Sequence, residues 1–174
     1  MIYAVIDTNV LVSALITHNP ESATAKVVEG LLRQDFVLLY DADIIAEYED
    51  VLHWAKFPIL PGVADALIAH VMAHGIEASR VDFAEEMPDE DDRVFYEVSL
   101  SLEDSFLVTG NLKHYPITPR VITPADFIAH LKDKETFNEE ASLQHAERSL
   151  EKRLLSSVVV YNKEDNRGQL WTTN

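Results

Sequence analysis

The sequence feature that most constrains the fold is a short apolar run at residues 2–6 that stops at Asp7. This run is rich in β-branched side chains and does not alternate with polar residues, which is typical of a strand buried on both faces. Comparable runs occupy residues 36–39, 105–108 and 121–122. Strands of this kind belong to parallel sheets, in which neighbouring strands are joined by crossover helices.

Between these runs, apolar residues recur at helical spacing. The pattern predicts helices over residues 9–15, 22–32, 41–53, 64–74, 91–102 and 123–131. Asp41 is placed to cap the third helix, and Gly75 is placed to end the fourth. The alternation of strands and helices predicts an α/β fold with a mostly parallel central sheet flanked by helices.

The length of 174 residues suits one domain with one sizeable core. A change in composition near residues 132–136 leads us to expect a principal domain over residues 1–133 and an extension over residues 134–174 that is not an independent domain. The extension is expected to contain one charged helix, at about residues 138–155, and a hairpin over residues 158–172.

The helix expected in the extension carries a narrow apolar stripe, formed by Leu143, Leu150 and Leu154. An apolar stripe is usually buried, so we expect it to pack on its own domain or on a second copy of the chain. The second possibility predicts a homodimer.

The composition excludes several classes of protein. The chain has no cysteine, which excludes a disulfide scaffold, a thiolate zinc site and a cysteine nucleophile. No apolar run approaches the ~20 residues needed to span a bilayer, so we expect no membrane partner. The first 16 residues contain Asp7 and Asn9 and lack the basic start of a signal peptide, so a cytoplasmic protein is expected.

The formal net charge is −16, from 14 basic and 30 acidic residues. A protein that binds duplex nucleic acid by releasing counterions is normally basic, so the charge counts against a high-affinity duplex binder. The charge does not exclude a nuclease, because bound metal ions supply local positive charge at the active site.

Acidic residues at three places in the chain are candidates for chemistry. Asp7 follows a buried strand, where ligands bind in open parallel sheets, although it could also serve only as a helix N-cap. Glu47 lies at the edge of the apolar stripe of its helix, where it can reach a cleft or simply pack on the rim. Asp91 and Asp92 stand where the next helix begins, which is also where the helix dipole favours acids.

Polar residues follow a further strand. Thr109, Gly110 and Asn111 place a hydroxyl and an amide at the end of the run at residues 105–108, although they could form no more than a turn. His114 could be a general base, a phosphate contact or an ordinary loop histidine, and we favour the last interpretation. Carboxylates gathered at strand ends suit two-metal hydrolysis of a phosphodiester, because carboxylate oxygens bind hard cations that activate water and stabilise the leaving oxygen.

The chain resembles the PIN domain family over roughly residues 2–131. The matching pieces come in the family order, and they are residues 4–10, 44–48, 51–52 with 56–57, 91–95, and 107–111 with 113–114. The resemblance is strongest to the branch whose members are described as toxin components of toxin–antitoxin systems, the VapC-like proteins.

The resemblance implies an RNase-H-like three-layer fold and a metal-dependent endoribonuclease that hydrolyses single-stranded RNA with Mg²⁺ or Mn²⁺. Asp7, Glu47 and Asp92 match the three family acids that hold the metal, and Asp91 replaces Asp92 if the register differs by one. The positions that match supporting or catalytic polar residues are Thr8, Asn9, Thr109 and Asn111. A toxin of this branch implies a cognate antitoxin protein as partner.

Two alternatives remain open. Asn111 stands where many members of the family carry a fourth acid, and this departure weakens a second metal site. Together with the charge of −16, it leaves room for a non-catalytic module that binds RNA or a protein. An aspartate phosphotransferase is disfavoured, because Asn9 stands where the haloacid dehalogenase type needs its second aspartate, and no acidic pair of a receiver domain follows the first strand.

Overall fold

A computed structural model describes residues 1–134, 136, 143–145 and 148–149. The expected hairpin at residues 158–172, most of the helix expected at about residues 138–155, and Leu150 and Leu154 lie outside the described residues. The chain divides into two units, Met1–Leu131 and Lys132–Asn174. The fold below is that of the first unit.

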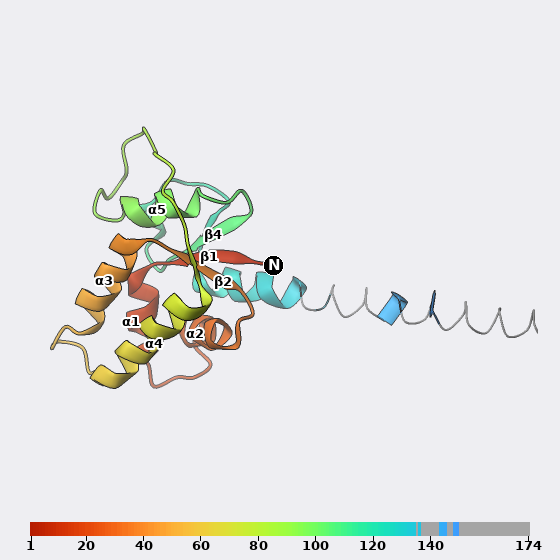
Figure 1. The fold of residues 1–174 in the computed structure, drawn as a ribbon, viewed down its shortest axis with the longest axis horizontal. Coiled ribbons are helices and arrows are strands. Elements are labelled where there is room, and N and C mark those ends of the chain that lie inside the picture. Colours follow the sequence, from red (N-terminus) through yellow and green to blue (C-terminus); the bar gives the residue numbers. More distant parts are fainter. Residues whose placement is uncertain (135, 137–142, 146–147, 150–174) are drawn as a thin grey trace, which may run out of the picture. The chain divides into compact units, whose positions relative to one another are not determined.

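The first unit is built on a five-stranded sheet (Figure 1). Its strands are β1 (Tyr3–Ile6), β2 (Val37–Tyr40), β3 (Ile76–Glu77), β4 (Ser105–Val108) and β5 (Val121–Ile122). They are ordered β3-β2-β1-β4-β5, and every pairing is parallel. The central strand β1 pairs with both β2 and β4, which explains why its residues are almost wholly apolar. The structure confirms the expected α/β class.

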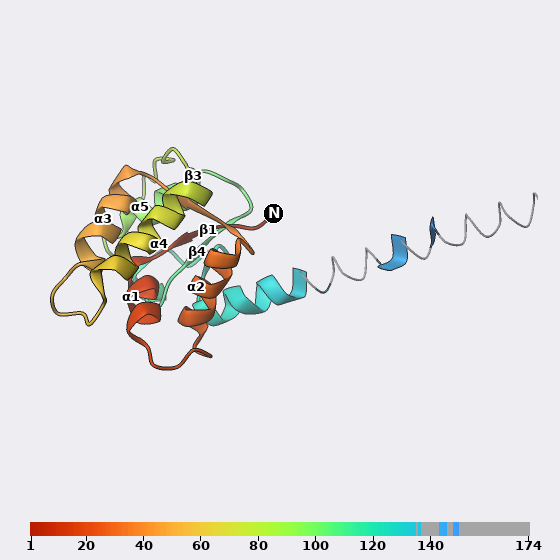
Figure 2. The ribbon, with the colours of Figure 1, turned by 60° about the horizontal axis from the view of Figure 1, so that its bottom comes forward.

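Helices cover both faces of this sheet. The labelled helices are α1 (Thr8–Ile16), α2 (Ala23–Arg33), α3 (Ala42–Leu52), α4 (Pro61–His74), α5 (Arg93–Ser99) and the 3₁₀ turn η1 (Leu112–His114). A further helix begins at residue 124 and runs to the end of the first unit. Figure 1 shows α5 on one side of the sheet, and Figure 2 brings α1, α2 and α4 forward on the other. No helix among the described residues is long and apolar enough to cross a membrane.

The edge strand β3 is absent from the sequence-based expectation. It has only two residues, which pair with Leu39 and Tyr40 of β2, so it carries no periodic pattern of its own. Gly75 allows this pairing, because a Cβ there would lie 2.7 Å from the Val71 carbonyl oxygen and 2.8 Å from the Leu38 carbonyl oxygen. The chain can therefore turn from α4 into the sheet only where a side chain is absent.

The ends of several helices differ from the expected positions, most informatively those of α4 and α5. Helix α4 begins at Pro61 rather than at residue 64, because proline is tolerated in the first helical turn. Helix α5 covers Arg93–Ser99 rather than residues 91–102. The Ser99 carbonyl accepts hydrogen bonds from the Ser105 hydroxyl and the Arg120 guanidinium. These tertiary donors satisfy the carbonyl at the end of the helix and replace the intrahelical bonds of another turn.

The core ties α3 directly to the central strand. Tyr48 is fully buried, and its hydroxyl donates to the Ile6 carbonyl oxygen at the last position of β1. Glu47, the preceding residue of α3, is thereby held beside the carboxyl end of the sheet. Asp41 caps α3 as expected, accepting a hydrogen bond of 2.9 Å from the Ile44 amide.

Candidate active site

The register of the sheet brings Asp7 and Thr109 together. Ile6 at the end of β1 pairs with Val108 at the end of β4, so the residue that follows each strand lies at the same edge. The Asp7 amide donates to the Val108 carbonyl oxygen at 3.0 Å, which extends the pairing by one residue. Both side chains are buried, with Asp7 only 4% exposed and Thr109 fully covered. Two residues 102 positions apart in sequence therefore form one polar centre.

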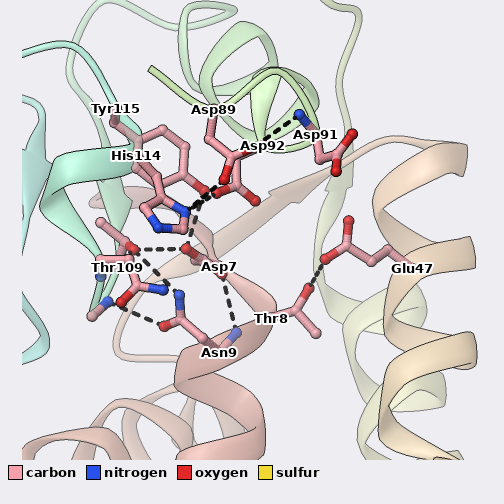
Figure 3. Close-up of polar contacts among 12 residues, drawn as sticks. Asp7, Thr8, Asn9, Glu47, Asp89, Asp91, Asp92, Thr109, His114 and Tyr115 are labelled. Carbon is pink, nitrogen blue, oxygen red and sulfur yellow. Dashed lines mark hydrogen bonds and ion pairs between the residues drawn. The ribbon is translucent and has the colours of Figure 1, made fainter. Parts of the chain in front are cut away.

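The Asp7 carboxylate accepts three hydrogen bonds (Figure 3). The donors are the Thr109 hydroxyl at 2.6 Å, the Tyr115 hydroxyl at 3.1 Å and the Asn9 amide at 3.0 Å. The last of these is an N-cap bond, because Asp7 precedes the first residue of α1. Asp7 thus caps a helix and also presents a fixed carboxylate at the edge of the sheet, so the two interpretations of this residue do not compete.

Tyr115 is a member of the site that the sequence did not single out. It is buried, and burial, followed by the negative charge of Asp7, raises the pKa of its hydroxyl far above the ordinary value. The hydroxyl therefore stays protonated and acts as a donor to Asp7. A tyrosine seven residues beyond the end of β4 carries no local signal for this role, since the contact depends on the loop that follows the strand.

The Asn9 side chain links the loop after β4 to the start of α1 by hydrogen bonds. Its side-chain carbonyl oxygen accepts from the Gly110 amide at 3.1 Å, and its amide group lies 3.5 Å from the Thr109 hydroxyl. The Thr109 hydroxyl also accepts from the Asn111 backbone amide at 2.9 Å. Among the described contacts, Asn111 joins the network through its backbone alone. The sequence-based expectation of a catalytic role for its side chain stays a prediction.

Glu47 reaches the site from α3. It accepts a hydrogen bond of 2.6 Å from the Thr8 hydroxyl, in the first residue of α1 (Figure 3). Burial raises the pKa of the Glu47 carboxyl, the bond from Thr8 opposes this rise, and the negative charge of Asp7 adds to it. Thr8 and Asn9, expected as a supporting pair, therefore contact different parts of the site: Thr8 holds Glu47, and Asn9 holds the β4 loop.

Asp92 occupies the N-cap position of α5 but makes no capping hydrogen bond with its side chain. Its carboxylate instead accepts from the Nδ1 atom of His114 at 2.8 Å. The Asp89 carboxylate lies 3.1 Å from the same ring nitrogen. His114 is therefore not an ordinary loop histidine. The sequence pattern did not reveal that His114 contacts both Asp89 and Asp92. They meet because η1 lies against the start of α5.

The three predicted acids act on one another electrostatically. Burial raises the pKa of the Asp92 carboxyl, the bond from His114 opposes the rise, and the charge of Asp7 adds to it. The negative charges of Asp7 and Asp92 also raise the pKa of the Glu47 carboxyl. The structure therefore brings Asp7, Glu47 and Asp92 around a shared space, where His114, when protonated, offsets part of the negative charge of Asp92.

Asp91 differs from Asp92 in its contacts. Asp91 is exposed, and its backbone amide donates to the Asp89 carboxylate at 3.2 Å. Asp92 is partly buried and bonded to His114. Asp91 is still close enough for its charge to raise the pKa of Glu47. Asp92 is the better placed of the two, and Asp91 borders the same space.

The side chains present suit a hard divalent cation. Asp7, Glu47 and Asp92 offer carboxylate oxygens, the donors that Mg²⁺ and Mn²⁺ prefer, and a cation would relieve their mutual repulsion. A second set overlaps with this one: one ligand atom each from Asp89, Asp92 and His114 lie within 4.8 Å of one another. Asp92 belongs to both sets. The nitrogen of His114 suits Mn²⁺ better than Mg²⁺.

The comparisons with known proteins agree with this arrangement. The family model described as the PIN domain matches residues 3–113. No curated protein and no solved structure matches the chain significantly. The matched region contains β1 to β4 and every candidate acid described above. The chain belongs to the PIN domain family.

Proposed function

We propose that this protein is a metal-dependent endoribonuclease that hydrolyses phosphodiester bonds of single-stranded RNA. PIN domains are generally nucleases, so the reaction class follows from the family. The substrate and the metal are our inference. The single observation that carries the proposal is the meeting of Asp7, Glu47 and Asp92, from three separate elements, where the charge of Asp7 acts on both other carboxyls.

Asp7, Glu47 and Asp92 would hold Mg²⁺ or Mn²⁺. When bound, such an ion supplies Lewis acidity, which polarises water and a phosphate oxygen. The protein side chains around the acids fix their orientation. Thr109 and Tyr115 hold Asp7, Thr8 holds Glu47, and His114 holds Asp92. Supports of this kind set the position and basicity of ligands, and their loss commonly costs about 10- to 100-fold in affinity or activity.

The biological setting belongs to the same proposal. The resemblance to toxin components leads us to propose that the nuclease is the toxin of a toxin–antitoxin pair, acting in the cytoplasm as a homodimer. Expression in a host cell would then arrest growth, and co-expression of the neighbouring gene would restore it. Normal growth on expression of a protein that cleaves RNA in the tube would reject the toxin role and leave the nuclease proposal intact.

The nuclease proposal is tested by cleavage of labelled single-stranded RNA with Mn²⁺ or Mg²⁺. The parent should cleave, and EDTA should stop the reaction. Asp7→Asn and Asp92→Asn should lose most of the rate, because each removes a charged oxygen ligand. Glu47→Gln should do the same, whereas Glu49→Gln, two residues further along α3 on an exposed position, is the matched control and should cleave like the parent.

Two outcomes would contradict the proposal. If Glu47→Gln and Glu49→Gln cleave equally well, the carboxylate of Glu47 has no part in the reaction. If the parent binds RNA but leaves it intact with either metal, the protein is the non-catalytic module that Asn111 and the net charge of −16 also allow.

A further inference from the structure

The connection between α3 and α4 carries an aromatic pair that the proposed cleavage site does not use. The rings of Trp54 and Phe57 are stacked, with centroids 6.1 Å apart and planes inclined by 11°. The ammonium of Lys56 lies 3.7 Å from the centroid of the Trp54 ring and 4.9 Å from that of Phe57. Trp54 is 40% exposed, so a large part of this flat, cationic surface faces solvent.

The aromatic pair is held in a fixed position. The indole N–H of Trp54 donates to the Asp50 carboxylate at 3.2 Å, and the Phe57 amide donates to the Trp54 carbonyl oxygen at 2.9 Å. His53 bridges the two helices, with Nε2 lying 2.9 Å from Asp65 of α4. Phe57 also packs against the core. A ring held in this way loses little conformational entropy when a ligand stacks on it.

The pair follows α3, the helix that carries Glu47. Asp50 lies one turn beyond Glu47 on α3, so both residues face the same side of the helix. Trp54 lies two residues beyond Leu52, the last residue of α3, and its indole N–H is bonded to Asp50.

Lys56 adds a positive charge to the aromatic pair. Lys26 is neutralised by Glu21 and Glu29. In contrast, within the described part of the chain no carboxylate lies at ion-pair distance from Lys56, which contacts the two aromatic rings instead. Its ammonium is therefore available to a phosphate, beside rings on which a base can stack.

We propose that Trp54, Lys56 and Phe57 form a platform for single-stranded RNA, on which one base stacks while Lys56 contacts a phosphate. RNA as the ligand rests on the proposed function. The platform would hold one nucleotide of a strand whose phosphodiester lies at the carboxylates. Such stacking tolerates any base, so the platform contributes affinity and register rather than sequence specificity.

The first test follows Trp54 directly. The chain has two tryptophans, so in Trp171→Phe the emission comes from Trp54 alone. The full-length variant is titrated in EDTA, where no metal supports cleavage, with a twelve-residue oligouridylate and with an abasic strand of equal length. The oligouridylate should quench Trp54, and the abasic strand should not. Equal quenching by both strands, or by neither, would overturn the platform.

The second test measures affinity for fluorescein-labelled oligouridylate by anisotropy under the same conditions. Trp54→Ala should raise Kd about 5- to 150-fold, and Trp54→Phe should retain most of the affinity. Lys56→Gln should reduce the slope of log Kd against log salt by about 0.7, the value for one contact to a single strand. Met72→Ala removes another exposed apolar side chain, on α4, and should bind like the parent.

The outcomes separate this inference from the nuclease proposal. A parent that cleaves RNA with Mn²⁺, and a folded Trp54→Ala that binds and cleaves as the parent does, would overturn the platform alone. A parent whose binding depends on Trp54 but that never cleaves would overturn the nuclease alone. If Trp54→Ala fails to fold, Lys56→Gln becomes the deciding variant, and an unchanged salt slope overturns the phosphate contact.

Discussion

Asp7 provides the clearest test of the site, because its carboxylate both caps α1 and accepts hydrogen bonds from two hydroxyls. Asp7→Ala removes the cap of α1 and also the acceptor for the Thr109 and Tyr115 hydroxyls. Loss of an N-cap costs about 1 kcal/mol. Each buried hydroxyl left without an acceptor costs about 1 to 3 kcal/mol. The total is about 3 to 7 kcal/mol.

Relief of charge repulsion opposes this loss. Removing Asp7 frees Glu47 and Asp92 from an unfavourable interaction, which for partly exposed groups is worth about 1 kcal/mol or less. The variant should therefore be less stable than the parent by at least about 2 kcal/mol. For a chain of this size, ~1 kcal/mol shifts Tm by about 2 to 4 °C, so Asp7→Ala should melt at least about 4 to 8 °C lower.

The assay is a set of melting curves in EDTA and in Mn²⁺. Ser22→Ala is the control for a cap alone, because Ser22 caps α2 through one bond to the Ala25 amide and has no part in the site. It should melt about 2 to 4 °C below the parent. Mn²⁺ at a hundredfold excess over Kd should stabilise the parent by about 2.7 kcal/mol, and both Asp7→Ala and Asp7→Asn should gain much less.

Two results would refute this reasoning. If Asp7→Ala melts no lower than Ser22→Ala, the carboxylate does not satisfy the two buried hydroxyls. If either Asp7 variant gains as much from Mn²⁺ as the parent does, Asp7 is not a ligand and serves only to cap α1.

Two further predictions concern residues other than the three catalytic acids. Arg93 lowers the pKa of the Glu90 carboxyl to about 2, so in an NMR titration Arg93→Gln should return that pKa toward 4.5. Because the folded-state value is depressed, the stabilisation by this pair is present above about pH 4.5 and is lost as the pH falls toward about 2, and the variant should lack that acid dependence. Gln34 ends α2 in the left-handed region, at φ 63° and ψ 34°. Gln34→Gly should therefore stabilise the fold by about 0.5 to 1 kcal/mol, and an unchanged urea midpoint would contradict the cost assigned to this conformation.

The parts of the fold that could be predicted are those with a local physical cause. The apolar run before Asp7 has no polar alternation, and it forms the buried central strand β1. Asp41 marks the start of α3 because capping depends on residues within one turn. Gly75 marks the end of α4 as expected, but its backbone is extended rather than left-handed, and β2 at Leu38 also leaves no room for a side chain there. Strand β3 could not be predicted, since two residues form a strand only when β2 is there to pair with them.

The residues of the candidate site also separate into those that local sequence could predict and those that depend on tertiary packing. The sequence by itself determined that Asp7 follows a buried strand and that Thr109 follows another, and parallel pairing then brings the ends of these strands to one edge of the sheet. Only the tertiary structure decided that Tyr115 donates to Asp7, and that His114 and Asp89 join Asp92. These contacts link loops whose paths are set by packing rather than by periodicity. A side chain on such a loop acquires its partner, and therefore its chemistry, only when the chain has folded.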